Sequence, residues 1–268
     1  MNDDMNAALT DEVVDDLAAF GPFFAVETHL PGSRPPPPWH PMNELIADPG
    51  ALRDRVTAVG AALAAAGGRP SHAVEFRVAA SVTHLGLAAR ILSPALAVAV
   101  TRDDLLDIGL RNTWWQPTLG GAFPLSAPRG ADPDAAGHNP KPRLTPEHLA
   151  QLLASRVLNG PVRELLQATA VLSVSPRILW GNVASAVNGA ASMIAARRPA
   201  CAERSRMIAS LLLNQPPLRG TSITTASGGF RRRSCCLIYR VIPEKPAAVC
   251  GDCVLSRDPP SLPHNPPR

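Results

Sequence analysis

The chain has 268 residues, of which 46% are hydrophobic, 4% are aromatic and 18% are charged, and its formal net charge is +4. This length is ample for one compact domain or two small ones, and the alanine-rich, aromatic-poor composition favours helices that pack closely through small side chains. The 29 prolines gather in loops and towards the end of the chain, which excludes a collagen-like or low-complexity protein.

The first residues carry the wrong charges for a secretory signal. Residues 1–16 hold six acidic side chains and no basic one, the opposite of a signal peptide's positive start. The longest uncharged run, 178–196, contains several polar side chains and is too polar to cross a bilayer comfortably. We therefore expect a cytoplasmic protein without a transmembrane segment, in a compartment where thiols stay reduced.

The first hundred residues predict three helices and one short strand. Gly67-Gly68 is a typical end for the second helix, and Ser93-Pro94 predicts the end of the third. The run of valine and alanine that follows is typical of a buried strand. The expected elements are helices over 10–20, 43–66 and 73–92, and a strand over 96–101.

The middle of the chain predicts a small sheet followed by helices. Two short strands flank a turn rich in glycine and proline, and a long loop comes next. Thr145 is placed to cap the following helix, with Pro146 at its first position. The expected elements are strands over 113–116 and 122–126, a loop over 130–142, helices from 146 and over 161–172, 176–198 and 200–213, and a linker over 221–230.

Trp114 and Trp115 lie beside that glycine-rich turn. Two adjacent indoles could stack on a ligand, although tryptophan is more often a core or rim side chain. Both residues are therefore candidates for substrate contact. The chain shows no glycine-rich phosphate loop, no Gly-x-Ser-x-Gly and no paired carboxylates suited to hydrolysis.

One face of the helix expected over 176–198 is small and polar. At 100° per residue, Gly181, Asn182, Ser185, Asn188, Gly189 and Ser192 fall on a single stripe. Small residues of this kind allow another helix to approach closely. Alternatively, the stripe lines a polar cavity, and in that case Asn182 is the first residue to test.

Four of the five cysteines lie close together near the end of the chain. Cys235 and Cys236 are adjacent, Cys250 and Cys253 form a Cys-x-x-Cys, and thirteen residues separate the two pairs. Four such thiols favour Zn²⁺ or an iron–sulfur cluster. Adjacent cysteines point to opposite faces of an extended backbone, so this pair needs either a bent backbone or two metal atoms. The spacing favours iron–sulfur over zinc, with a disulfide or no site as further alternatives.

The positive charge of the chain is concentrated beside these cysteines. Residues 219–268 hold eight basic and three acidic side chains, whereas residues 1–218 hold 18 and 19. Arg231, Arg232 and Arg233 directly precede the first cysteine pair. Cationic groups near thiolates lower their pKa and offset the negative charge of a cluster, although a solvated basic segment is the simpler interpretation.

The runs Arg232-Arg233-Ser234-Cys235-Cys236-Leu237-Ile238-Tyr239-Arg240 and Cys250-Gly251-Asp252-Cys253 resemble the C-terminal motif of FhuF-like ferric siderophore reductases. Ile178 to Ala186 is similar to the central helix of that family, and Trp114 to Leu125 resembles it more weakly. The family usually has a shorter spacing between its cysteine pairs.

This resemblance implies an α+β fold: a predominantly helical domain with a small antiparallel sheet over 1–225, then a short cysteine-rich segment over 226–268. It implies that Cys235, Cys236, Cys250 and Cys253 ligate a [2Fe-2S] cluster. The implied activity is transfer of one electron to ferric iron in a siderophore, of hydroxamate type, releasing Fe²⁺.

The resemblance also bears on partners. The electron would come from a separate protein of ferredoxin or flavodoxin type, or from a reductase, because no flavin or nicotinamide site is visible. Arg231 to Arg233 and Asn182 are candidates for substrate contact. No nucleic-acid partner is expected, but peripheral contact with an importer is compatible with the sequence. The rival functions are a binding module with a four-cysteine zinc site and a siderophore-binding protein without redox activity.

Overall fold

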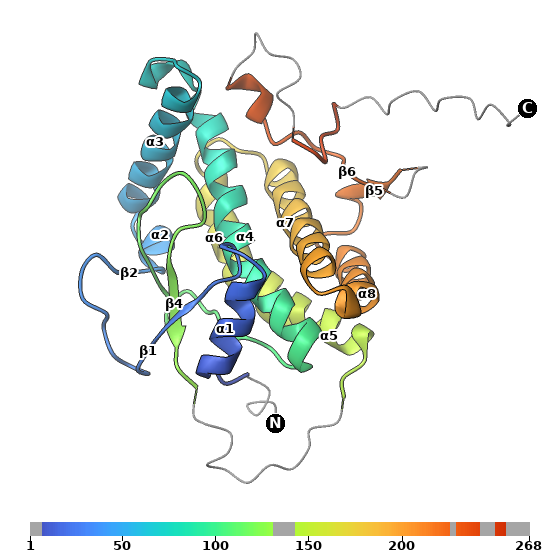
Figure 1. Cartoon of the computed structure of the whole chain (residues 1–268). Coiled ribbons are helices and arrows are strands. Elements are labelled where there is room, and N and C mark those ends of the chain that lie inside the picture. Colours follow the sequence, from blue (N-terminus) through green and yellow to red (C-terminus); the bar gives the residue numbers. More distant parts are fainter. Residues whose placement is uncertain (1–6, 131–142, 226–228, 242–249, 256–268) are drawn as a thin grey trace, which may run out of the picture.

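The structure is a computed structural model that describes residues 7–130, 143–225, 229–241 and 250–255. It is mainly helical with a small sheet, as the sequence predicts (Figure 1). The helices are α1 Asp11–Ala19, α2 Glu44–Ala47, α3 Pro49–Ala66, α4 Phe76–Arg102, α5 Pro146–Leu152, α6 Arg163–Ala170, α7 Pro176–Arg197 and α8 Ala202–Leu213. The strands are β1 Glu27–His29, β2 His40–Pro41, β3 Trp114–Trp115, β4 Leu125–Pro128, β5 Ser222–Thr224 and β6 Phe230–Arg232.

Shorter helical segments complete the chain. A π-helical stretch, Leu153–Val162, joins α5 to α6, and 3₁₀ turns occupy Ser71–Ala73, Pro199–Cys201 and Ile238–Arg240. Several helices begin where the sequence predicts. The Thr145 hydroxyl accepts a hydrogen bond from the amide of His148, 3.2 Å away, and Pro146 is the first helical residue of α5.

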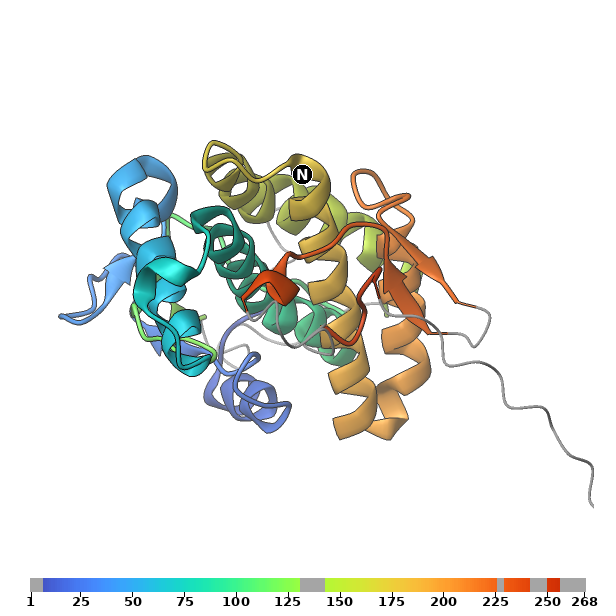
Figure 2. The same cartoon turned by 90° about the horizontal axis from the view of Figure 1, so that it is seen from above.

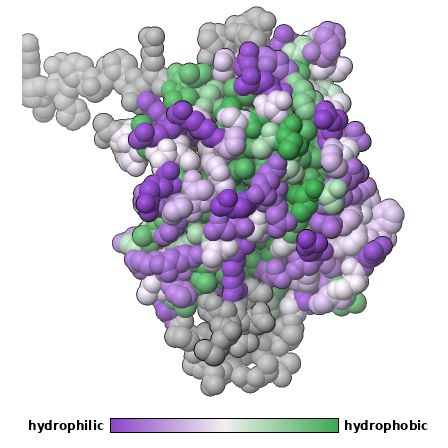
Figure 3. All heavy atoms as spheres, turned by 180° about the vertical axis from the view of Figure 1, so that it is seen from behind, coloured by the Kyte–Doolittle hydropathy of each residue, from purple (hydrophilic) through white to green (hydrophobic). Residues whose placement is uncertain are grey.

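Helices α4 and α7 pack against each other at the centre of the molecule. Both are long and apolar enough to cross a bilayer, but 78% and 56% of their most apolar windows are buried inside the protein. Helix α3 packs on α4, and α8 packs on α7 (Figure 2). The surface seen from behind mixes hydrophilic residues with an apolar strip (Figure 3). Within the described residues, α4 and α7 are thus core helices.

Helix α4 is longer than the sequence predicts. The expected stop at Ser93-Pro94 and the expected strand over 96–101 are both wrong, because one helix continues through Pro94 to Arg102. Proline removes one backbone hydrogen bond, a cost of about 3 kcal/mol. Every residue from 94 to 100 is buried, so packing against the surrounding helices outweighs this local preference.

The helix expected over 43–66 is two helices. Asp48 adopts an extended conformation between α2 and α3, and its carboxylate accepts a 2.7 Å hydrogen bond from the amide of Gly50. This cap and Pro49 at the first position start α3 anew. The predicted end holds, since Gly67 caps α3 and Gly68 adopts a positive φ of 66°.

The larger sheet has the strand order β1-β4-β3-β2. Strands β3 and β4 are antiparallel, in agreement with the two strands expected there, but β1 pairs with β4 in parallel. Buried Arg90 of α4 ties this region together, because its guanidinium donates hydrogen bonds to three backbone carbonyls: Phe23 (2.6 Å), Phe123 (2.8 Å) and Ala25 (2.9 Å). Burial lowers the pKa of Arg90 to about 10.

The segment expected to be a linker over 221–230 contains a strand. Strands β5 and β6 form an antiparallel pair in which Ile223 lies opposite Arg231. Its serine, threonine and glycine content led to the linker prediction, but Ile223 and Thr224 are β-branched and suit extended backbone. The hairpin and the larger sheet lie on opposite sides of α4 and α7 (Figures 1 and 2). The domain boundary expected at 225–226 lies between β5 and β6.

Candidate metal centre and the adjoining groove

The two cysteine pairs meet beside strand β6. The Sγ atoms of Cys236 and Cys250 are 3.5 Å apart, although the two residues are fourteen positions apart in sequence. Leu237, directly after the first pair, has a left-handed backbone with φ of 71°, and a 3₁₀ turn follows. The second pair forms a tight turn in which the Cys253 amide donates to the Cys250 carbonyl at 3.0 Å. The fold thus brings one thiol from each pair together.

Backbone amides point at two of the sulfur atoms. The Leu237 amide donates to Cys235 Sγ and the Leu255 amide to Cys253 Sγ, each at 3.3 Å. Each donor is two residues after the cysteine it contacts. Amide hydrogen bonds to sulfur stabilise negative charge there and tune the reduction potential of a metal–thiolate centre.

The thiols do not share one pKa. The hydrogen bond with Cys250 lowers the pKa of Cys236 to about 6, and the Ile238 amide and Arg232 act in the same direction against the effect of burial. The same hydrogen bond, together with burial, raises the pKa of Cys250. Burial raises the pKa of Cys235 as well, opposed by the Leu237 amide and Arg232. The Cys236–Cys250 pair therefore readily loses one proton and holds the other.

The cysteine segment is anchored to the central helices through Arg232. The guanidinium is buried and donates a 2.6 Å hydrogen bond to Oδ1 of Asn182 on α7. Asn182 is also buried, and its amide nitrogen donates to the carbonyl of Ser81 on α4 at 2.9 Å. The backbone amide of Arg232 donates to the carbonyl of Asp252 at 3.0 Å, so the same residue joins the two cysteine pairs.

Several buried polar atoms around Arg232 have no hydrogen-bond partner among the described residues. They are Nε and Nη1 of Arg232, both ring nitrogens of His84 and the hydroxyl of Ser234. Burial, and secondarily the charge of Arg232, lowers the pKa of His84 to about 3, so this imidazole is neutral at pH 7. Gly181 fits this crowded contact because a Cβ there would meet the Ser234 hydroxyl and the Arg232 guanidinium.

The separation of two of the thiols is close to that of two ligands on one metal ion. Two sulfur ligands on one tetrahedral ion, each about 2.3 Å from it, lie roughly 3.7 Å apart. The Cys236–Cys250 separation of 3.5 Å is close to this value. Cys235 interacts electrostatically with both Cys236 and Cys253, and none of the five cysteines forms a disulfide. Within the described residues, no three His, Cys, Asp or Glu side chains are yet close enough to hold a single ion. Four thiols are the donor set that a sulfur-ligated centre uses, and joint ligation would require Cys235 and Cys253 to approach the Cys236–Cys250 pair.

The other candidate residues lie in different surroundings. Trp115 is buried in the larger sheet, where its Nε1 donates to Glu44 Oε1 at 3.1 Å, and Trp114 is its neighbour in β3. Arg231 is half-buried in β6 and Arg233 is exposed. Most of the loop expected over 130–142 lies outside the described residues, as do residues 242–249 between the two cysteine pairs.

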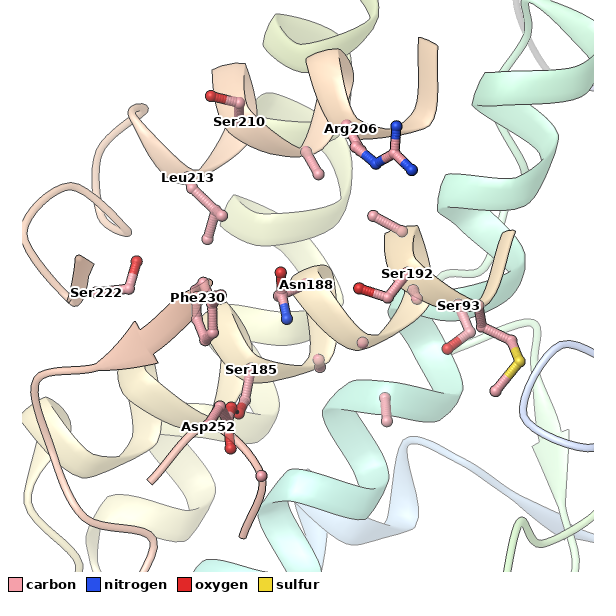
Figure 4. A pocket seen from close by; sticks show the side chains of 18 of the residues that line it. Ser93, Ser185, Asn188, Ser192, Arg206, Ser210, Leu213, Ser222, Phe230 and Asp252 are labelled. Carbon is pink, nitrogen blue, oxygen red and sulfur yellow. Dashed lines mark hydrogen bonds between the residues drawn. The ribbon is translucent and has the colours of Figure 1, made fainter. Parts of the chain in front are cut away.

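A groove borders the cysteine segment. It has a volume of about 1010 Å³ and runs between α4, α7, α8 and the β5–β6 hairpin. Gly251 and Asp252, the two residues between Cys250 and Cys253, line one end of it. Figure 4 shows Asn188 in the middle, Ser185 beside Asp252, and Arg206 and Ser192 towards the other end. The Ser185 hydroxyl donates a hydrogen bond to the Asp252 carboxylate.

The two parts of the polar stripe of α7 lie in different surroundings. Its first part, Gly181 and Asn182, lies beneath Arg232 and Ser234, so the close approach at Gly181 is made by the cysteine segment and not by another helix. Its second part, from Ser185 to Ser192, lines the groove, which agrees with the cavity interpretation. Asn182 itself is buried and does not line the groove, and neither do Trp114, Trp115 or the three arginines. The groove residues on α8 and the hairpin carried no sequence motif, so sequence reasoning missed them.

The fold and the site together define a mainly helical protein with a C-terminal four-cysteine segment suited to an iron–sulfur cluster. Residues 232–255 match the family model of the FhuF 2Fe-2S C-terminal domain. This match supports an FhuF-like family for the chain and indicates a [2Fe-2S] cluster as its cofactor. It suggests an iron–sulfur role like that of siderophore-iron reductases. No curated protein matches the chain, and no solved structure does.

Proposed function

We propose that the protein reduces ferric iron held by a siderophore and that Cys235, Cys236, Cys250 and Cys253 ligate its [2Fe-2S] cluster. The observation that carries the proposal is the 3.5 Å approach of Cys236 Sγ to Cys250 Sγ within a segment that matches a 2Fe-2S domain. The approach brings one thiol from each pair together. Four thiols without a disulfide are the ligands that such clusters use.

The proposed reaction is a single electron transfer. Fe³⁺ in a siderophore is a hard ion held by oxygen donors, and Fe²⁺ is held much less tightly by the same donors. A bound [2Fe-2S] cluster supplies a one-electron carrier. One electron leaves the reduced donor protein and arrives on the chelated Fe³⁺, which becomes Fe²⁺ without any covalent bond being broken in the ligand. Hydroxamate siderophores are the proposed substrates, in the cytoplasm.

The chain's own residues prepare the centre for this electron. The Leu237 and Leu255 amides donate to two of the sulfurs, and the buried charge of Arg232 favours thiolate over thiol at Cys235 and Cys236. These interactions stabilise added negative charge, and a more easily reduced centre follows.

The electron donor is proposed to be a separate acidic protein. Arg233 is exposed and Arg231 is half-buried beside the first cysteine pair, so a negatively charged surface would dock there. A ferredoxin-type or flavodoxin-type protein has suitable chemistry, as does a reductase. Peripheral contact with an importer would bring the substrate to the protein.

The test begins with anaerobic purification and measurement of absorption, iron and acid-labile sulfide. We expect a coloured protein with about two irons and two sulfides per chain, as the cluster stoichiometry requires. The dithionite-reduced protein should then convert a ferric trihydroxamate to Fe²⁺, detected with a ferrous-specific chelator. Cys236→Ser should lose both colour and turnover, whereas the matched control Cys201→Ser, half-buried and remote in sequence, should keep both. A colourless protein that contains only zinc, or neither iron nor zinc, would contradict the proposal.

A further inference from the structure

The groove beside Asp252 has the position, size and chemistry of a ligand site. We propose that it binds the ferric chelate and presents it to the cysteine segment. This inference rests on the proposed function, since it names where that reaction's substrate lies. It replaces Trp114, Trp115 and Asn182 as substrate contacts, because none of them lines the groove.

The groove lies against the turn that carries the second cysteine pair. Gly251 and Asp252 line the groove and are enclosed in sequence by Cys250 and Cys253. The Ser185 hydroxyl holds the Asp252 carboxylate at this end, and the Asp252 carbonyl accepts from the Arg232 amide. A molecule at this end of the groove therefore contacts the turn that carries the second cysteine pair. Electron transfer needs such closeness and no covalent contact.

The groove is large enough for a bulky ligand. The volume of about 1010 Å³ lies at the upper limit of typical small-molecule sites, which range from about 300 to 1,000 Å³. A wrapped chelate is bulky, so a small site would not admit it. The α7 wall is kept low by Ser185, Gly189 and Ser192. A Cβ built on Gly189 meets nothing within 4 Å, so the space in front of this glycine is open.

The lining of the groove contains polar groups but carries no net charge. Hydroxyls and side-chain amides from α7, α8 and β5 line the groove, and these groups can donate hydrogen bonds to the oxygen atoms of a chelate. Among the described residues that line it, the charged ones are Arg206 and Asp252, and their charges cancel. A wall without net charge offers no compensation for a highly anionic ligand. The groove therefore favours a chelate close to neutral, which a ferric trihydroxamate is, over a trianionic ferric tris-catecholate.

The test fills the groove at Gly189 and leaves the cysteines untouched. Gly189→Phe places a ring in the open space, and Gly189→Ala adds only a methyl group. Ala61→Phe is the matched control, because Ala61 is also inside a helix, is exposed, and belongs to α3, no residue of which lines the groove. Absorption spectrum and iron content verify that each variant carries its cluster.

Binding is measured with the gallium(III) complex of a linear trihydroxamate, because Ga³⁺ cannot be reduced under these conditions and so reports occupancy alone. We expect Gly189→Phe to weaken its binding at least about tenfold, a loss of about 1.4 kcal/mol, and to raise the KM for the iron complex similarly. Gly189→Ala and Ala61→Phe should bind as the unchanged protein does. A gallium tris-catecholate should bind more weakly than the trihydroxamate.

The outcomes separate the two proposals. If the unchanged protein does not bind the gallium complex, or if Gly189→Phe binds and reduces as well as Ala61→Phe, the groove is not the site. If the unchanged protein binds the gallium complex at the groove but its reduced cluster passes no electron to the iron complex, the site stands and the reductase function fails.

Discussion

Arg232 and Asn182, fifty residues apart in sequence, form a buried hydrogen bond of 2.6 Å between the guanidinium and the amide oxygen. Asn182 also donates a hydrogen bond to the Ser81 carbonyl on α4, so the cysteine segment is attached to both central helices. The bond links what the sequence presents as two separate features, a polar helix stripe and a basic run before the cysteines. It places a full positive charge beneath the thiols.

Replacing Asn182 by leucine should loosen this attachment. The variant leaves the buried guanidinium with the weak 3.4 Å contact to the Ile178 carbonyl, so we expect a loss of about 3 kcal/mol in the free energy of unfolding. Urea unfolding followed by circular dichroism measures it. Asn188→Leu, on the groove part of the same helix, should change stability by less than about 0.5 kcal/mol. Equal losses in the two variants would refute the anchoring role.

Removing the charge of Arg232 should lower the reduction potential of the centre. Arg232→Gln keeps a hydrogen-bond donor near Asn182 but withdraws the cation that acts on Cys235 and Cys236. We expect a decrease on the order of 50 mV, which is close to a tenfold change in the one-electron equilibrium. A dye-mediated redox titration measures it, with exposed Arg233→Gln as the control. A shift as large in the control would show that the effect is general surface charge.

Stability should depend on pH through His84. Its folded pKa of about 3 lies below the unfolded value of 6.5, so its contribution is complete above pH 6.5 and is lost as the pH falls from 6.5 towards 3. At pH 5 the loss is about 2 kcal/mol relative to pH 7.5. His84→Leu should remove this part of the pH dependence, measured by urea unfolding at the two pH values. His148→Leu, exposed at the start of α5, should keep it; if both variants keep it, His84 is not responsible.

Arg90 should be a major contributor to the fold far from the cysteines. Arg90→Met leaves the carbonyls of Phe23, Ala25 and Phe123 without their donor, and we expect a loss of about 3 to 5 kcal/mol in the free energy of unfolding. Thermal unfolding measures it. The exposed ion pair of Arg129 with Asp11 provides the comparison, since Arg129→Met should cost less than about 1 kcal/mol. A small effect of Arg90→Met would mean that water replaces the lost donor.

Local signals predicted much of this structure. Thr10, Thr145 and Ser175 cap their helices through bonds to an amide three residues later, so a few adjacent residues suffice to place each start. The cysteine motif is equally local. Its family resemblance led to the cofactor that the family-model match indicates.

Long-range packing accounts for what the sequence did not reveal. Helix α4 continues through Pro94 because the surrounding core buries that stretch, and β1 pairs with β4 across nearly a hundred residues. The groove has the same origin, since its walls come from α4, α7, α8 and the hairpin, which are separate in sequence. Asn182 drew attention as a ligand contact for its polarity, and only the position of Arg232 reveals its structural partner.

The hydrogen bond from the Arg232 amide to the Asp252 carbonyl connects the segments that carry the two cysteine pairs. This hydrogen bond and the contact between Cys236 and Cys250 determine how the two pairs are placed relative to each other. The intervening segment therefore has only to connect their ends. Residues can be gained or lost between the pairs at little entropic expense, since closure of a longer loop grows only logarithmically more difficult. The thirteen-residue spacing in this chain is then compatible with the close approach of Cys236 to Cys250.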